Sequence, residues 1–305
     1  CESDISKAME DALEKGIISG AVALHYPFPL GVATIGKVLT PARAKPCFIA
    51  SSTGTSSSNR VEAMVRNAIY GIAAAKADGI TSPTVGILNL DGAQTVLRAL
   101  QKLSEGGYPI TLGASVRKEG GPILRGNDLL AGSVDVCVTD TLTGNVLMKL
   151  FAAWNTGGNY EALGWGYGPS TGENWNKVVS IISRASGAPV VAGAITLNAR
   201  CAKNGLPAAV AGELKLAKKA GLEEILASLQ PKQTSSEEEV AAPPSEPTDD
   251  EIHGIDVLEI EEAVKALWKA GIYAESSMGC TGPVIKMAAA RIEKAKAVLK
   301  ENGYI

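Results

Sequence analysis

The sequence predicts an α/β protein with a mainly parallel sheet, helices on the faces of the sheet and a small helical tail at the C-terminal end. Short apolar runs alternate with amphipathic segments of helical period. Repeated units of a strand followed by a helix place the strands in one parallel sheet. The 33 glycines and an aromatic content of 5% also suit a tightly turned α/β enzyme better than a β-sandwich.

Each predicted strand is a short, mostly apolar run that a polar segment or a turn ends. The predicted strands are 21–24, 47–50, 84–90, 110–116, 134–138 and 189–195. Helices are predicted at 6–15, at 59–77, from Gly92 to about Leu103 and after each of the last two strands. Asn59 is a good N-cap residue for the second of these helices.

The composition changes after residue 230. Residues 231–254 are acidic and proline-rich with few large apolar side chains, which predicts a flexible linker. In 255–305, apolar residues at helical spacing predict a small helical tail that docks on the first domain, 1–230. The last helix is expected from Pro283 to about Lys300, because proline is favoured at the first helical position.

Length, charge and cysteine usage narrow the class of protein. A chain of 305 residues can bury a large core, and a net charge of −3 gives no reason to expect nucleic acid or an anionic membrane as partner. No apolar run reaches about 18 residues, and no signal-peptide pattern opens the chain. The cysteines are odd in number and lack metal-ligand spacing, so we expect no zinc site, no disulfide framework and a cytoplasmic location. They are Cys1, Cys47, Cys137, Cys201 and Cys280.

Cys280 is the strongest candidate for a reactive residue. It lies between Gly279 and Gly282, just before the helix expected from Pro283. Helix N-terminal N–H groups favour a thiolate, which is the nucleophilic form of cysteine. The N–H groups of Thr281 and Gly282 could then stabilise an oxyanion. The alternative is a buried structural cysteine beside a turn.

Ligands of parallel α/β sheets bind at the carboxyl ends of the strands. The loops at 51–58, 89–92 and 140–145 are therefore the expected pocket walls. The hydroxyl-rich run that contains Ser51 and Thr53 could bind an anion, or it could be an ordinary polar loop.

Two segments, 126–130 and 134–149, resemble the phosphate acyltransferase family of bacterial phospholipid synthesis. In that family a strand ends in an aspartate and a Phe-Thr-Gly-Asn turn opens a helix. Asp140 and Thr143–Asn145 match this pattern, with Leu142 in place of the phenylalanine. The resemblance implies a three-layer α/β/α sandwich, shared in outline with isopropylmalate dehydrogenases and phosphotransacetylases.

The acidic linker and the Gly-Cys-Thr-Gly-Pro segment are similar instead to the alpha subunits of component C of glycine reductase complexes. This resemblance covers essentially the whole chain. Relative to the phosphate acyltransferases, about the first quarter is absent, and the sequence opens on a helix rather than a strand. We therefore expect an N-terminally truncated form of the sandwich.

The second resemblance implies an acetyltransferase. A carboxymethylated selenoprotein A supplies the two-carbon unit, a thiolase-like beta subunit is the partner in component C, and inorganic phosphate releases the acetyl group as acetyl phosphate. Cys280 would carry the acetyl thioester, since a thiolate is both nucleophile and leaving group. No cofactor and no metal are expected.

The phosphate would bind at the turn after residue 139. The turn of Thr143, Gly144 and Asn145 could present N–H groups to it, and Asn145 could also donate from its side chain or simply cap the helix. Asp140 could act as a base, orient a partner, or be a satisfied carboxylate at a strand end.

Three other functions remain as alternatives. A long-chain phosphate acyltransferase needs no catalytic cysteine and leaves the tail unexplained. A non-catalytic scaffold for a thiolase-like beta subunit needs only the fold. An oxidoreductase of the isopropylmalate type is disfavoured, because the sequence has no clustered aspartates suited to a divalent metal.

Overall fold

The computed structural model describes residues 2–117, 120–229, 240–256, 259–279 and 282–305. The chain forms two compact units. The larger unit comprises Cys1–Asn89 with Ala99–Leu229, and the smaller unit comprises Leu90–Arg98 with Gln230–Ile305.

The larger unit is built on a sheet with the strand order β5-β4-β7-β3-β2-β8, in which β6 also pairs with β4. From β5 to β3 the neighbouring strands are parallel, and β6 is parallel to β4. β2 runs antiparallel to both β3 and β8, so one side of the sheet is antiparallel. The strands are β2 (Val32–Leu39), β3 (Pro46–Thr55), β4 (Thr84–Leu88), β5 (Thr111–Leu112), β6 (Ile123–Leu124), β7 (Val136–Val138) and β8 (Ser170–Gly172). A separate parallel pair joins β1 (Ala21–Ala23) to β9 (Val179–Ile181).

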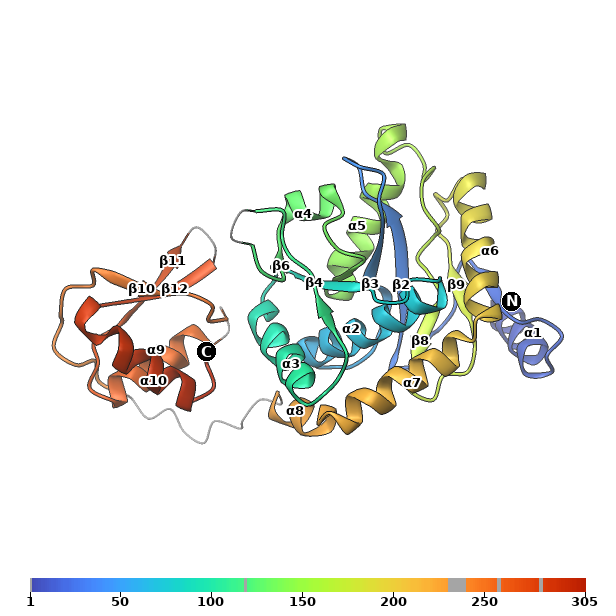
Figure 1. The fold of residues 1–305 in the computed structure, drawn as a ribbon. Helices are drawn as coiled ribbons and strands as arrows, with labels where there is room; N and C mark the ends of the chain where they lie inside the picture. Colours follow the sequence, from blue (N-terminus) through green and yellow to red (C-terminus); the bar gives the residue numbers. More distant parts are fainter. Residues whose placement is uncertain (1, 118–119, 230–239, 257–258, 280–281) are drawn as a thin grey trace. The chain divides into compact units, whose positions relative to one another are not determined.

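Helices cover both faces of the sheet. Figure 1 shows α4 and α5 on one side and α2 and α7 on the other. The predicted α/β fold with a mainly parallel sheet between helices is therefore confirmed. The helices before residue 230 are α1 (Glu2–Glu14), α2 (Arg60–Ala77), α3 (Ala93–Glu105), α4 (Gly126–Ala131), α5 (Thr141–Ala153), the 3₁₀ helix η1 (Trp154–Thr156), α6 (Ala188–Lys203), α7 (Leu206–Lys219) and α8 (Leu222–Ser228).

The segment 189–195, predicted as a strand, lies in helix α6. Its apolar residues recur every three or four positions on the buried face, which is the helical period. Those buried apolar residues are Val190, Ala194, Leu197 and Cys201. Pro189 stands in the first turn of α6, where proline is tolerated.

Strand β3 is longer than predicted, because it continues to Thr55 instead of ending in a loop after Ala50. Antiparallel pairing with β2 extends it, with Val32 opposite Thr55 and Thr34 opposite Thr53. Strand β2 is not among the predicted strands, which is why Ser51–Thr55 were expected in a loop.

The smaller unit contains a three-stranded antiparallel sheet in the order β10-β12-β11, where the sequence predicted only helices. Ile285 and Met287 of β12 point into its core at the two-residue period of a strand. This alternation outweighs the helical propensity of the segment that begins at Pro283. The elements are β10 (Asp250–Ile252), α9 (Ile260–Lys269), β11 (Glu275–Gly279), β12 (Gly282–Met287), the 3₁₀ helix η2 (Ala289–Arg291) and α10 (Ile292–Glu301).

The predicted linker, 231–254, ends inside this sheet, since β10 occupies Asp250–Ile252. Residues 230–239 lie outside the described residues. The division into a first domain, a flexible linker and a tail stays a prediction.

Candidate functional site

Two helices of the larger unit begin beside each other at the carboxyl ends of neighbouring parallel strands. β3 and β7 pair in register from Phe48 opposite Val136 to Ala50 opposite Val138. α2 follows β3 in the chain and α5 follows β7. The guanidinium of Arg60, the first residue of α2, lies 3.0 Å from the carboxylate of Asp140, which precedes α5. The two helix N-termini therefore meet in a charged contact at the sheet edge where ligands bind in this class of fold.

Asp140 is the N-cap of α5. Its carboxylate accepts hydrogen bonds from the N–H of Thr143 at 2.9 Å and from the Thr143 hydroxyl at 2.8 Å. Burial alone would raise the pKa of Asp140, but the hydrogen bonds from Thr143 and Arg60 and the nearby positive charge of Arg60 hold it below its usual range. The carboxylate is therefore ionised at neutral pH and engaged with three donors.

Gly144 and Asn145 fix α5 against β3. A Cβ atom added to Gly144 would lie 1.8 Å from the carbonyl oxygen of Ser51. The side chain of Asn145 donates a hydrogen bond to the carbonyl oxygen of Ser52 at 3.0 Å. Both residues thus have a structural role, and phosphate binding by Thr143, Gly144 and Asn145 stays a prediction.

Ser51 belongs to the same cluster, although it lies in a strand rather than in a loop. Its hydroxyl is 2.7 Å from the hydroxyl of Thr141 and accepts a hydrogen bond from the side chain of Asn67 at 3.2 Å. Thr53 is held elsewhere, since its hydroxyl lies 2.7 Å from that of Thr34 on β2. The structure therefore brings Ser51 and the 140–145 segment together and leaves Thr53 bonded to β2.

Three residues of this cluster were missed by the sequence analysis: Arg60, Asn67 and Thr141. The positions of Arg60 and Thr141 carried a signal, because each is the first residue of a helix that follows a central strand. Asn67 lies in the middle of α2 and is fully buried. An isolated asparagine in an apolar helix gives no such signal.

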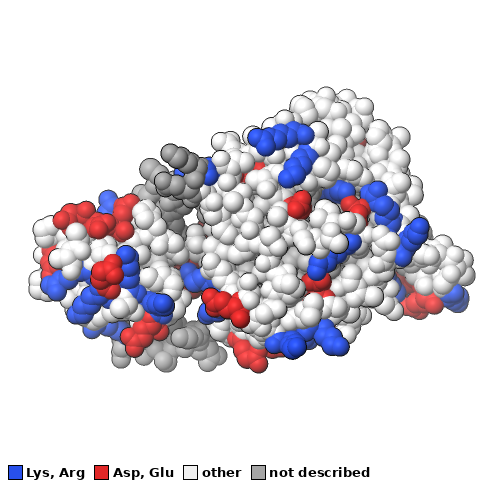
Figure 2. Space-filling model, in the orientation of Figure 1, with Lys and Arg blue, Asp and Glu red and all other residues white. Residues whose placement is uncertain are grey.

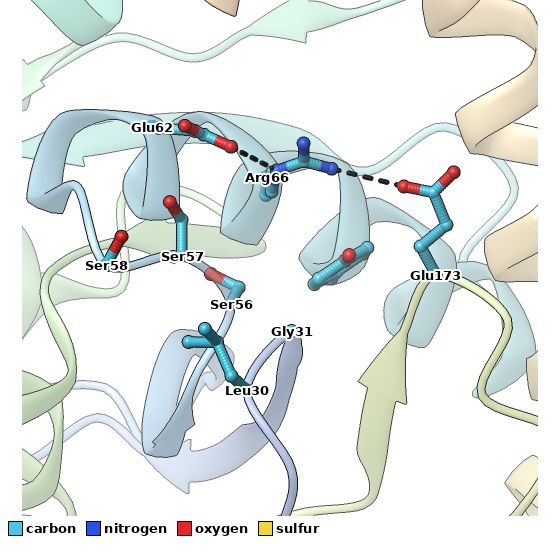
Figure 3. A pocket seen from close by; sticks show the side chains of 9 residues that line it. Leu30, Gly31, Ser56, Ser57, Ser58, Glu62, Arg66 and Glu173 are labelled. Carbon is cyan, nitrogen blue, oxygen red and sulfur yellow. Dashed lines mark hydrogen bonds and ion pairs between the residues drawn. The ribbon is translucent and has the colours of Figure 1, made fainter. Parts of the chain in front are cut away.

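A small polar cavity of about 270 Å³ adjoins the first turns of α2. Figure 3 shows the guanidinium of Arg66 between the carboxylates of Glu62 and Glu173, above the serines that precede the helix. Arg66 donates to Glu62 at 2.9 Å and to Glu173 at 3.3 Å. The arginine is thus neutralised by its own neighbours. Three serines line the cavity, namely Ser56, Ser57 and Ser58.

A larger cavity of about 690 Å³ lies at the other end of α5. Leu130, Leu150, Phe151 and Trp154 give it a mainly apolar wall. At its polar edge, the Lys149 ammonium is hydrogen-bonded to the hydroxyl of Tyr167 at 2.9 Å. Tyr167 in turn donates to the buried carboxylate of Glu161.

The described cysteines Cys47, Cys137 and Cys201 are buried. Burial raises the pKa of the Cys47 and Cys201 thiols to about 12, and it raises that of Cys137 well above its ordinary value. None of the three is a thiolate at neutral pH, so none is suited to nucleophilic catalysis.

Cys280 and Thr281 lie outside the described residues. The residues on either side of them, Gly279 and Gly282, pair across the antiparallel strands β11 and β12. Pro283 belongs to β12, and the next α-helix begins only at Ile292. The helix predicted to begin at Pro283 is therefore wrong at its start, and the N–H of Gly282 belongs to a strand. The reactivity of Cys280 stays a prediction.

Among the described residues, no group of three or more His, Cys, Asp and Glu side chains could hold a metal ion. No described helix is long and apolar enough to cross a membrane. On the face seen in Figure 2, basic and acidic side chains are interspersed. The described residues of that face form no broad basic area of the kind that nucleic acid needs.

The comparisons with known proteins agree with this architecture. The model of the family described as "Fatty acid synthesis protein" matches residues 2–286. The glycine/sarcosine/betaine reductase complex component C subunit alpha of Peptoclostridium acidaminophilum is 54% identical over 306 residues, which cover 100% of this chain and 80% of that protein. Shorter matches join the chain to phosphate acyltransferases. The phosphate acyltransferase of Phenylobacterium zucineum is 40% identical over a match that covers 29% of this chain and 25% of that protein. The phosphate acyltransferase of Anaplasma phagocytophilum is 29% identical over a match that covers 48% of this chain and 45% of that protein. The chain therefore belongs to the fatty acid synthesis protein family and, within it, to the component C alpha subunits of glycine/sarcosine/betaine reductase complexes, which are relatives of the phosphate acyltransferases.

Proposed function

We propose that the chain is an acetyltransferase subunit that releases an enzyme-bound acetyl thioester as acetyl phosphate. The identity of 54% over the full chain to a component C alpha subunit supports this assignment, and the phosphate acyltransferase relatives support acyl transfer to phosphate. The partners would be a thiolase-like beta subunit and a carboxymethylated selenoprotein A. Inorganic phosphate would be a substrate, and no cofactor is required.

The single observation of the structure that favours this function is the contact between Arg60 and Asp140 where α2 and α5 begin. A guanidinium and a helix N-terminus both stabilise a phosphate. Asp140 has a lowered pKa and three donors, so it is a weak base at neutral pH. Of the roles that the sequence left open, we therefore assign it the orientation of Arg60 and of the first turn of α5.

In the proposed reaction, Cys280 carries the acetyl group. A phosphate oxygen attacks the carbonyl carbon of the thioester, the carbon–sulfur bond breaks, and acetyl phosphate leaves while the thiolate is restored. Thr281 and Gly282 remain candidate donors to the oxyanion, without the helix dipole that the sequence predicted.

Mass spectrometry after incubation with acetyl phosphate tests this proposal. We expect one acetyl adduct, on the peptide that contains Cys280, and we expect Cys280→Ala to lose it together with acetyl-phosphate turnover. Cys201→Ala is the matched control, because Cys201 is fully buried with a raised thiol pKa and its loss should change neither result. Unchanged turnover in Cys280→Ala would instead favour the scaffold or the long-chain enzyme.

The large cavity beside α5 gives the long-chain phosphate acyltransferase one supporting observation, since its apolar wall suits an acyl chain better than an acetyl group. The two functions differ in chain-length preference. Turnover of acetyl phosphate but not of decanoyl phosphate supports the acetyltransferase, and the reverse order supports the long-chain enzyme.

A further inference from the structure

We infer that Asn67 is a positioning residue that turns the hydroxyl proton of Thr141 toward the anion bound at the start of α5. The inference rests on the proposed function, because it names a further group in that phosphate site. Asn67 acts through Ser51, and neither Asn67 nor Thr141 was singled out by the sequence.

The inference starts from a chain of buried hydrogen bonds between the two helices. Ser56, in the loop before α2, lies 2.7 Å from the Oδ1 of Asn67, and the Nδ2 of Asn67 lies 3.2 Å from the hydroxyl of Ser51. Ser51 in turn lies 2.7 Å from the hydroxyl of Thr141, the first residue of α5. Asn67 and Ser51 are fully buried, while Thr141 is only partly buried. The chain thus runs from the core to the edge of the site.

The distances indicate which group donates and which accepts in each of these hydrogen bonds. A separation of 2.7 Å is usual for O–H···O, whereas 3.2 Å is at the long end of the range for N–H···O and beyond the range for O–H···O. The amide of Asn67 therefore accepts from Ser56 and donates to Ser51. Since Ser51 is shielded from water, its own proton needs an acceptor. Either hydroxyl of the Ser51–Thr141 pair could donate; among the described residues the hydroxyl oxygen of Thr141 is the one oxygen that lies within reach of that proton, so we infer that Ser51 donates to Thr141.

These hydrogen bonds determine where the hydroxyl proton of Thr141 points. Because its oxygen already accepts a proton from Ser51, its own proton is left to point away from the core. The other hydroxyl of this turn, that of Thr143, donates to Asp140 instead. Thr141 is therefore the hydroxyl of the first turn that can donate to an oxyanion beside Arg60.

The first experiment measures inorganic phosphate binding by titration calorimetry and its KM in acetyl-phosphate formation. Thr141→Val keeps the shape of the side chain but removes the donor. We expect the dissociation constant for phosphate and the KM for phosphate each to rise about tenfold, with little change in kcat. Thr141→Ser keeps the hydroxyl and should bind phosphate nearly as the unaltered protein does.

The second experiment reverses the direction of these hydrogen bonds. An ionised carboxyl introduced by Asn67→Asp can only accept, so Ser51 would donate inward and draw the proton of Thr141 with it. We expect Asn67→Asp to weaken phosphate binding about as much as Thr141→Val, also about tenfold, and the double variant to be no weaker than either. Burial raises the pKa of the introduced carboxyl, which becomes a donor again when it is protonated. The affinity relative to the unaltered protein at the same pH should then recover as the pH falls from 8 to 5.5.

Asn198→Asp is the matched control, since Asn198 is also a buried helical asparagine that donates to backbone carbonyls and to a serine, Ser180. It should lower thermal stability and leave phosphate affinity unchanged at every pH. Phosphate binding that is unaltered in Thr141→Val, additive losses in the double variant, or a loss in Asn67→Asp that does not vary with pH would each overturn the inference while the proposed function stands. If the unaltered protein neither binds phosphate nor forms acetyl phosphate, the proposed function and the inference both fall.

Discussion

Helices α2 and α5 both begin at the carboxyl end of a parallel strand, yet their first turns are held in different ways. Asn59 caps α2 with a neutral amide oxygen, which accepts from the N–H of Glu62 at 3.0 Å. Asp140 caps α5 with a carboxylate that also bonds to Arg60. The start of α2 is therefore held by a neutral cap, whereas the start of α5 is held by a charged cap that pairs with Arg60.

The two helices also differ in how they approach the sheet. Each has one glycine that faces β3 or its neighbour. A Cβ atom on Gly144 of α5 would lie 1.8 Å from a backbone oxygen, that of Ser51, whereas one on Gly71 of α2 would meet side-chain atoms of Val136 at 2.5 Å and Ala50 at 3.1 Å. Side chains can move aside more easily than a strand backbone. The position of α5 is thus fixed more tightly by β3 than the position of α2.

The largest expected loss of stability follows from the closer approach of α5 to the backbone of β3. Gly144→Ala should lower the free energy of unfolding by about 3 kcal/mol or more, because α5 has to shift away from β3. Gly71→Ala should cost about 1–2 kcal/mol less than that, since Val136 can adjust. Urea unfolding curves measure both. Equal losses in the two variants would contradict the distinction between backbone and side-chain packing.

Gly126→Ala is the control for these two variants. Gly126 is the first residue of α4, its φ is not positive, and an added Cβ would meet nothing within 4 Å. The replacement should be neutral or stabilise by about 0.5 kcal/mol, because alanine has the better helix propensity and the unfolded chain loses freedom.

The next largest loss of stability is expected when the N-cap residues of α5 and α2 are replaced. Asp140→Ala removes the cap and the contact with Arg60, so we expect a loss of about 2 kcal/mol. Asn59→Ala removes a neutral cap and should cost about 1 kcal/mol. Thermal unfolding at neutral pH compares them. Equal losses, or a larger loss for Asn59→Ala, would mean that the charge at the start of α5 adds nothing to its stability.

Much of the first domain could be predicted because its signals are local. Asn59 was identified as a cap from the residue type and the helix that follows, and the structure confirms it. The run that begins at Thr84 is mostly apolar, as expected for a central parallel strand, and it forms β4. The pairing of Asp140 with Arg60 joins residues far apart in the sequence, so no local pattern indicated it.

In the smaller unit the predicted helices are confirmed in α9 and α10, but its strands were not predicted, for a physical reason. Its segment after Pro283 is rich in alanine and lysine, and intrinsic propensity there favours a helix. The fold instead buries Ile285 and Met287 on one face of a strand between β10 and β11. β12 pairs with β11, which directly precedes it, and with β10, which lies about thirty residues earlier in the chain, so strand pairing decided the outcome against local propensity.

The smallest expected effect separates the charge of Asp140 from its capping role. Asparagine is also a good N-cap, so Asp140→Asn should keep the cap and lose only about 0.5 kcal/mol at neutral pH. The pKa of Asp140 is lowered in the folded state, and the stability that its charge adds is therefore present above its unfolded pKa of about 4 and lost as the pH falls through the folded value.

The difference in stability between the unaltered protein and Asp140→Asn should accordingly be constant from pH 7 to about 5 and vanish as the pH falls below about 4. Arg60→Gln removes one of the groups that lower this pKa, so in that background the difference should be smaller and should begin to fall at a higher pH. Arg43→Gln removes an equal charge from an exposed position and serves as the control. Thermal unfolding of the unaltered protein, the three single variants and the double variant Arg60→Gln/Asp140→Asn across this pH range measures these differences. A pH-independent difference would mean that α5, like α2, is capped only by neutral hydrogen bonding, and the contrast between the two helix starts would then rest on Gly144 alone.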